Sequence, residues 1–221
     1  MNIKWNRYLI MAIISFFAFM LEYFSIFVIE KMILHVDIWN YTANQRSLHC
    51  LIMVVLWGIV IVSLLTYTYH QYHFPHQNEQ LKRMSYQDYM IIGLCLILCK
   101  VMTFIDWHTL KVIGELQGKS LYQFFAQYMY YIFEVGLVCL IIIYGQKAIE
   151  TLLKKETEIP FGGFLLAFTW GVFHFVSRGQ GIEIWNGISC MFFSVLSGIM
   201  YLKVKRKIGW SYILIAIGYL L

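Results

Sequence analysis

The sequence predicts an all-α, polytopic membrane protein, and its composition, its long apolar runs and the placement of its prolines all indicate this class. Hydrophobic residues make up 60% of the chain and charged residues only 13%, with a mean hydropathy of +0.66. Soluble domains carry about 25% charged residues. The apolar runs approach the roughly 20 residues that a helix needs to cross a bilayer. The only two prolines, Pro75 and Pro160, lie in polar connectors between such runs.

Seven apolar segments are expected to form transmembrane helices, because each is close to the required length and carries few charges. The first is too long, and too poorly flanked by small residues, for a cleaved signal peptide, so it is expected to stay as an anchor. The last is short and is expected to be tilted, re-entrant or cut off. The segments are Tyr8–Phe27, Leu51–Tyr69, Tyr89–Ile105, Leu121–Gly145, Phe161–Ser177, Gly187–Leu202 and Ile208–Leu221.

The distribution of lysine and arginine predicts the orientation of the chain. If the N-terminus is cytoplasmic, eleven Lys and Arg residues fall on the cytoplasmic side and five on the other, with Lys100 inside a span. The positive-inside rule therefore predicts a multi-pass protein of the cell membrane with a cytoplasmic N-terminus. The basic run KVKRK at 203–207 suits anionic lipid headgroups, so membrane lipids are expected partners. This run is too short and too close to two spans to indicate nucleic-acid binding.

The cysteines and histidines predict neither a metal site nor a cofactor. The five cysteines lie in or beside apolar spans without paired spacing, which argues against a disulfide framework or a zinc site. His70, His73 and His76 recur at a spacing of three, but Pro75 prevents one continuous helix from presenting all three rings. A solvated loop is the better interpretation of this triplet, and a metal site is the alternative.

Glu134 and His174 are ionisable groups near the middle of consecutive apolar segments. Such groups are costly in hydrocarbon and often mark functional sites. At about 1.5 Å per residue, Glu134 lies roughly 17 Å from Gly145 and His174 roughly 20 Å from Phe161, so both can share one layer of the membrane. The pair could then hydrolyse a peptide. Glu134 would act as the general base that activates a water molecule, and His174 would hold this water and stabilise the oxyanion. The alternative, which spacing alone favours, is a Glu–His hydrogen bond that locks two helices.

Glu22 and Lys100 are further charges inside apolar segments. A charge in lipid is stabilised by an opposite partner, so a structural ion pair between Glu22 and Lys100 is expected. The alternative is that Lys100 approaches Glu134 instead.

Three stretches of the C-terminal half carry a family resemblance. They read YIFEVGLVCLIIIYGQKAIE at 131–150, LLAFTWGVFHF at 165–175 and MFFSVLSGIMYLKVKRKIGWSYILI at 191–215. In this order they resemble the motifs of the CAAX-protease and bacteriocin-processing (CPBP or Abi) family of intramembrane glutamic peptidases. Trp170 and His174 match its second motif, an aromatic residue four before a histidine. The resemblance covers residues 127–221. It implies a CPBP-like core over 121–221, with N-terminal helices over 1–120, in one transmembrane domain.

The first motif is incomplete in this chain. In many members of the family it reads E-E-I-G-W-R-G-F-L-L, and its paired glutamates correspond here to Phe133 and Glu134. The resemblance implies that the missing glutamate is the usual catalytic base. The arginine of the motif falls on Val138, so its charge is lost as well.

The last motif is altered too. Its histidine falls on Gly218, and the polar residue four positions later lies beyond the given sequence. No polar side chain replaces this histidine unless Tyr219 turns inward. Losing one such group costs a factor of about 100–1,000 in rate. Asn186, Ser189 and Ser194 of the sixth segment are candidate replacements that can face the same cavity.

Three functions remain open. The first is a catalytically degenerate family member that binds a membrane-embedded peptide, a lipidated peptide or another membrane protein. Bacteriocin immunity, peptide maturation or regulation of a cell-envelope enzyme would fit such a protein. The second is an atypical intramembrane endopeptidase that uses Glu134 and His174. The third is a small transporter or transporter subunit with Glu22, Lys100 and Glu134 along a polar path.

Overall fold

The computed structural model describes residues 4–74, 83–177 and 181–221, and these residues form helices joined by turns. Five of the described helices are long and apolar enough to cross a membrane. Two further apolar helices, Phe161–Gly171 and Ile208–Leu220, are shorter. The chain is therefore an all-helical protein with several potential membrane spans, namely Trp5–Ile33, Ala43–Tyr72, Tyr86–Leu116, Leu121–Leu153 and Ile184–Lys203.

Several spans contain more than one regular element. A 3-10 turn at Ala18–Met20 and a π-helical stretch at Ser25–Ile33 flank α2, and a second π-helical stretch, Ala167–Gly171, follows α7. The α-helices are α1 (Trp5–Phe17), α2 (Leu21–Phe24), α3 (Ala43–Tyr72), α4 (Tyr86–Trp107), α5 (Lys111–Leu116), α6 (Leu121–Leu153), α7 (Phe161–Leu166), α8 (Ile184–Lys203) and α9 (Ile208–Leu220).

Side-chain caps explain where the long helices begin, and residues in the left-handed conformation explain where they end. Thr42, Ser85 and Ser120 precede α3, α4 and α6, and each forms a capping box with the residue three positions on. A residue in the left-handed conformation ends each of these helices, and for α3 and α4 it is a histidine, His73 or His108. As a result α6 runs about two turns past the apolar segment that the sequence indicated.

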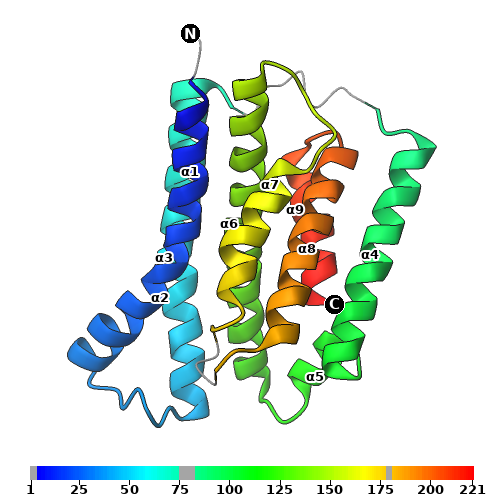
Figure 1. Ribbon diagram of the computed structural model, residues 1–221. Helices are drawn as coiled ribbons and strands as arrows, with labels where there is room; N and C mark the ends of the chain where they lie inside the picture. Colours follow the sequence, from blue (N-terminus) through cyan, green and yellow to red (C-terminus); the bar gives the residue numbers. More distant parts are fainter. Residues whose placement is uncertain (1–3, 75–82, 178–180) are drawn as a thin grey trace.

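Helix α6 forms the centre of the bundle. Its side chains are buried almost continuously from Glu134 to Gln146. Helices α1 and α3 pack on one side of it and α7, α8 and α9 on the other, while α4 packs outside α8 and α9 (Figure 1). A helix that is apolar all round belongs in a core. A charged side chain on α6 therefore meets other protein groups and needs partners among them.

Glycines bring α7 into backbone contact with α6 and α8. A Cβ atom on Gly162 would lie 2.0 Å from the backbone oxygen of Ile142, and one on Gly163 would lie 3.0 Å from the Cα atom of Gly198. The side-chain oxygen of Gln146 accepts a hydrogen bond from the backbone N–H of Gly162 at 3.0 Å, which satisfies one of the free donors at the start of α7. Small residues permit such close helix contacts in membrane proteins. The contact fixes the position of α7 along α6.

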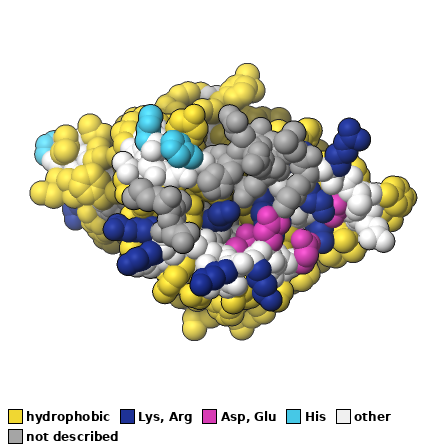
Figure 2. Space-filling model, turned by 90° about the horizontal axis from the view of Figure 1, so that it is seen from above, with side chains coloured by type: hydrophobic (Ala, Val, Ile, Leu, Met, Phe, Trp, Pro, Cys, Tyr) yellow, Lys and Arg dark blue, Asp and Glu magenta, His cyan; other side chains and the backbone are white. Residues whose placement is uncertain are grey.

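The end of the bundle near the N-terminus is held by ion pairs. Arg206 donates a hydrogen bond to Glu150 at 2.6 Å, with both side chains buried, and Lys205 Nζ lies 2.7 Å from Asp88 at the start of α4. Burial by itself lowers the pKa of Arg206. The hydrogen bond to Glu150 and the charge of Glu150 outweigh this effect, so the pKa of Arg206 is raised. Lys and Arg side chains surround acidic ones on this face (Figure 2). The basic run thus joins α4, α6 and the α8–α9 turn, rather than only facing lipid.

Gly162→Ala is expected to destabilise the protein, because the added Cβ atom would overlap the backbone of Ile142. We expect the free energy of unfolding to fall by about 2 kcal/mol or more, as in other overpacked cores. The measurement is the melting temperature of the purified protein in detergent. Gly93→Ala in α4 is the matched control, since its Cβ atom would meet nothing within 4 Å and alanine favours a helix by about 1 kcal/mol. Equal melting temperatures of the two variants would contradict the contact.

Candidate functional site

Glu134 is buried on α6, with an exposed fraction of only 6%. Trp170 Nε1, in the π-helical stretch after α7, donates a hydrogen bond to one carboxylate oxygen at 3.3 Å. The hydroxyl of Tyr219, in the last turn of α9, donates to the other oxygen at 2.8 Å. Each oxygen therefore has a protein donor, as a buried carboxylate requires. Tyr219 does turn inward, and it follows Gly218 directly in the sequence.

His174 lies in a turn just after its helix, not in the middle of a helix as the sequence indicated. Its Nδ1 atom lies 2.8 Å from the backbone oxygen of Trp170, and the two rings are 4.2 Å apart between centroids. Asn186 Nδ2 donates a hydrogen bond to the backbone oxygen of His174 at 2.9 Å. Trp170 thus contacts both Glu134 and His174, and it links the two groups that the sequence singled out.

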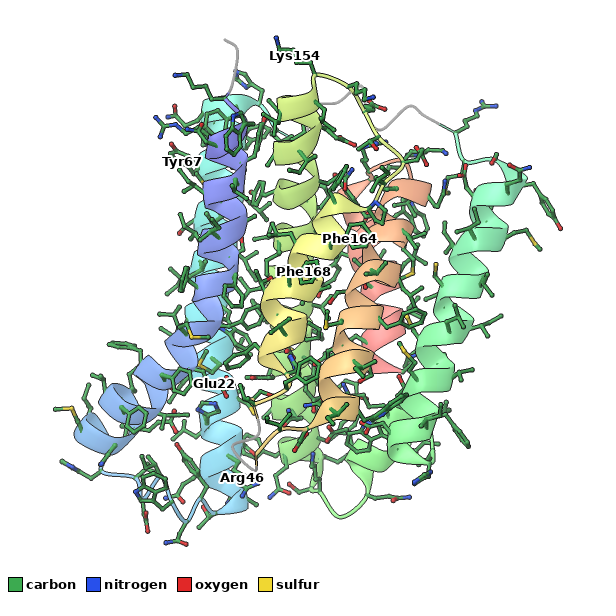
Figure 3. All side chains as sticks on the ribbon, viewed as in Figure 1. Glu22, Arg46, Tyr67, Lys154, Phe164 and Phe168 are labelled. Atoms are coloured by element: carbon green, nitrogen blue, oxygen red, sulfur yellow. The ribbon has the colours of Figure 1, made fainter. Side chains whose placement is uncertain are left out.

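A cavity of about 680 Å³ lies beside these groups, and we call it the larger cavity. Glu22 and Glu134 line it with two imidazoles, those of His49 and His174, and with Arg46. Figure 3 shows Glu22 and Arg46 in the same lower part of the bundle. The volume of the larger cavity lies within the range of small-molecule sites, which combine apolar walls with a few polar groups. Aromatic residues form most of the remaining wall: Phe19, Tyr23, Tyr41, Tyr130, Tyr131, Trp170, Phe173 and Tyr219.

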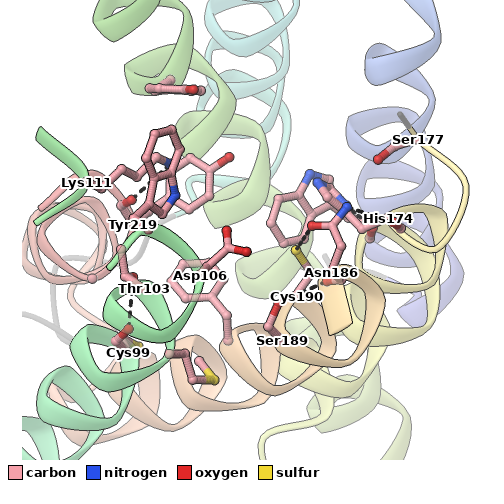
Figure 4. Close-up of a pocket in the computed structure, with 16 residues that line it drawn as sticks. Cys99, Thr103, Asp106, Lys111, His174, Ser177, Asn186, Ser189, Cys190 and Tyr219 are labelled. Atoms are coloured by element: carbon pink, nitrogen blue, oxygen red, sulfur yellow. Dashed lines mark hydrogen bonds between the residues drawn. The ribbon is translucent and has the colours of Figure 1, made fainter. Parts of the chain in front are cut away.

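A second cavity, of about 230 Å³, lies toward α4 and α8. Asp106, Lys111, Asn186 and Ser189 line it (Figure 4). Lys111 Nζ donates a hydrogen bond to the backbone oxygen of Tyr219 at 3.2 Å and lies 3.9 Å from the centre of its ring. The two cavities share part of their walls, namely Tyr131, Trp170, His174, Ser177 and Tyr219.

The three polar candidates of α8 lie in different places. Asn186 and Ser189 line the smaller cavity together with His174. Ser194 is fully buried and donates a hydrogen bond to the backbone oxygen of Cys190 at 2.7 Å, and it is not among the residues that line either cavity. A hydrogen bond of this kind within one turn is how a serine is accommodated inside a helix.

The expected ion pair between Glu22 and Lys100 is wrong, because α2 and α4 lie on opposite sides of α6 (Figure 1). Lys100 Nζ donates a hydrogen bond to the backbone oxygen of Gly218 at 3.1 Å, and Glu22 lies 3.5 Å from His49 Nε2. Carbonyl groups in the last turn of a helix lack partners within the helix and attract cations. The alternative that placed Lys100 against Glu134 is wrong as well, because the ammonium group of Lys100 donates to the end of α9 and the lysine whose charge acts on Glu134 is Lys111.

A second polar cluster beside the larger cavity is built on Glu30, which is 1% exposed. Ser25 and Tyr41 donate hydrogen bonds to its carboxylate at 2.6 and 2.5 Å, and His49 Nδ1 lies 2.7 Å from it. Burial and then Glu30 raise the pKa of Tyr41 well above its usual value, so this hydroxyl stays protonated and remains a donor. With Glu22 beyond Nε2, the ring of His49 lies between two carboxylates.

Sequence reasoning missed several residues of the site. Glu30 carried a usable signal, because it is a carboxylate in the apolar stretch that continues past Glu22. His49 carried none, since a histidine near the end of a span is expected at the membrane interface. Asp106 and Lys111 flank the connector after the third apolar segment, where charged residues are ordinary. Only the folded bundle brings them to a cavity.

Among the described residues, no group of three or more His, Cys, Asp or Glu side chains is placed to hold a metal ion. His70 and His73 are exposed near the end of α3. His76, the third member of the histidine triplet, lies outside the described residues.

Comparisons with protein-family models, with curated proteins and with solved structures gave no match.

Tyr219→Phe is expected to lower the free energy of unfolding by about 1–3 kcal/mol, because buried Glu134 loses a donor while the ring stays. The measurement is thermal unfolding in detergent micelles. Tyr212→Phe on the same helix is the matched control, since its hydroxyl donates to the neutral backbone oxygen of Ile132. We expect this control to cost nearer 1 kcal/mol. If Tyr219→Phe costs the same in a Glu134→Gln background, the hydroxyl does not act through Glu134.

Proposed function

We propose that this protein binds a membrane-embedded peptide, or a segment of a partner membrane protein, in the larger cavity. The observation that carries the proposal is the state of Glu134, whose two oxygens accept hydrogen bonds from Trp170 and Tyr219. A general base has to present a carboxylate oxygen to the water that it activates. Glu134 instead holds Trp170 and Tyr219 in place as a wall of the cavity, which suits binding better than hydrolysis.

The lining of the larger cavity supports a peptide ligand. Aromatic rings from several helices surround a small number of charged groups, and this combination is typical of ligand sites. Tyr23 and Arg46 line the cavity and are exposed. A chain segment can therefore reach the cavity from outside the bundle.

We propose further that residues 121–221 are a catalytically degenerate CPBP-like core. Glu134 on a long helix, Trp170 on the next with His174 in the turn after it, and a last helix that returns to Glu134 through Tyr219 follow the order of the family motifs. Such a member would serve in bacteriocin immunity, in peptide maturation or in regulation of an envelope enzyme. The missing base at Phe133 is consistent with a binding role.

The proposal includes seven spans and a cytoplasmic N-terminus in the cell membrane. The two shorter apolar helices, Phe161–Gly171 and Ile208–Leu220, would add to the five longer ones. The Lys and Arg side chains at the end of the bundle near the N-terminus support this orientation (Figure 2).

A fluorescent hydrophobic peptide tests the binding function, with its affinity for the purified protein in detergent measured by fluorescence anisotropy. Ile26→Trp is expected to weaken binding by about tenfold or more, because Ile26 lines the larger cavity and the indole would fill it. Phe27→Trp is the matched control, since Phe27 is exposed and is not among the residues that line the cavity. Equal affinities of the two variants would contradict binding in this cavity.

Glu134→Gln separates binding from catalysis. The amide keeps the shape of the side chain and can still accept a hydrogen bond from Tyr219, so we expect the peptide affinity to stay within about threefold of wild type. The same samples are analysed by mass spectrometry for cleavage of the peptide. Cleavage by the wild type that is lost in Glu134→Gln would replace the binding function by that of an endopeptidase with Glu134 as base.

A further inference from the structure

Glu22 is the open carboxylate of the larger cavity. Its side chain is 39% exposed, whereas Glu134 is buried and both of its oxygens accept hydrogen bonds. Glu22 lies 3.5 Å from His49 Nε2, which is longer than an ordinary hydrogen bond between these groups. Lone pairs of Glu22 therefore face the cavity and can accept a donor from a ligand.

His49 determines which ligand can bind next to Glu22. Glu30 accepts hydrogen bonds from Ser25 and Tyr41, so it is an ionised acceptor, and Nδ1 of His49 must donate its proton to it. Nε2 then either carries a second proton, which makes the ring an imidazolium that attracts Glu22, or presents a lone pair. In the second state Nε2 and Glu22 are two acceptors side by side. A donor from outside the protein can bind to both.

We propose that the larger cavity binds a cationic N–H donor, an ammonium or guanidinium group of the peptide, at Glu22 and His49 Nε2, and that each cation bound releases one proton from His49. This proposal rests on the binding function and names the group that is recognised. The N–H bond at Nε2 breaks and its proton goes to water, while N–H groups of the ligand donate hydrogen bonds to Nε2 and to Glu22. One positive charge replaces another, so the net charge of the site does not change.

The charges around the site favour a cation over an anion. Glu22 and Glu30 come from the N-terminal helix and Glu134 comes from α6, while the other basic groups are Arg46, His174 and Lys111, whose charge acts on Glu134. Aromatic faces stabilise a cation further. The remaining titratable groups of the lining are Tyr23, Tyr41, Cys50, Tyr130, Tyr131 and Tyr219. These thiol and hydroxyl groups are neutral in their protonated forms, so they do not offset the carboxylates.

Two labelled hydrophobic peptides test the proposal. They are identical except at one central position, which is lysine in the first and norleucine, the same stem without an ammonium group, in the second. Binding to the full chain in detergent is measured by anisotropy, and proton release by an indicator dye in weak buffer. We expect the lysine peptide to bind about tenfold more tightly. We expect it to release about one proton per peptide, with an affinity that rises with pH until His49 of the free protein is unprotonated.

Variants assign the effects to the two residues. Glu22→Gln is expected to remove most of the preference for lysine, because the amide carries no charge. His49→Gln is expected to keep part of the preference but to abolish the proton release. Glu158→Gln is the matched control, since this exposed carboxylate pairs with Lys203 and is not among the residues that line the larger cavity. It is expected to change neither measurement.

The possible outcomes separate this proposal from the binding function. Equal binding of the two peptides to the wild type, or a preference for lysine without proton release, overturns the cation site and leaves peptide binding intact. Failure of both peptides to bind overturns the binding function and the cation site with it. The comparison on the wild type does not depend on the folding of any variant.

Discussion

The backbone contact between Gly162 and Ile142 determines where the site can form. Because α7 runs antiparallel to α6 and meets it at this pair, residues at equal distances from the pair lie side by side. Trp170 is eight residues after Gly162, and Glu134 is eight residues before Ile142. Each lies about 12 Å from the contact along its helix. The indole therefore reaches the carboxylate, and their hydrogen bond is a consequence of how the glycines of α7 pack on α6. Any residue larger than glycine at 162 would move both helices.

Hydroxyl and indole donors hold the two buried carboxylates beside the larger cavity, with His49 as a further donor to Glu30, whereas Arg206 and Lys205 pair with Glu150 and Asp88 at the other end of the bundle. Glu134 accepts from Trp170 and Tyr219, and Glu30 accepts from Ser25 and Tyr41. Such donors satisfy the oxygens but leave the negative charge in place, whereas a lysine or arginine would cancel it. Lys100, which could have neutralised a carboxylate, binds the backbone of α9 instead. Glu22 therefore stays available to a ligand in the larger cavity, beside Nε2 of His49.

Composition and apolar length were enough to predict an all-helical chain with several apolar spans. The sequence also singled out Glu134 and His174, since an ionisable group in an apolar run is rare, and it singled out Trp170 through the family resemblance. The sequence could not predict the contacts of these three residues, because the contacts depend on the position along α6 at which α7 packs. The Glu22–Lys100 expectation failed because a charge in a span indicates that a partner is needed without identifying it. In this fold the partners were an imidazole and a backbone carbonyl, which no count of charges reveals.

The N-terminal helix shows why the cation site depends on an irregular backbone. In a regular α-helix, eight residues at about 100° each would turn Glu30 some 80° away from Glu22. The chain instead becomes π-helical from Ser25 onward, and both carboxylates approach the ring of His49. Wider turns of this kind are frequent at functional sites because they re-aim side chains. The proposed CPBP-like core begins at residue 121, so this arrangement lies outside it. The N-terminal helices therefore supply Glu22 and His49 of the proposed cation site, while α6 and the helices after it supply Glu134, Trp170 and Tyr219 of the same cavity.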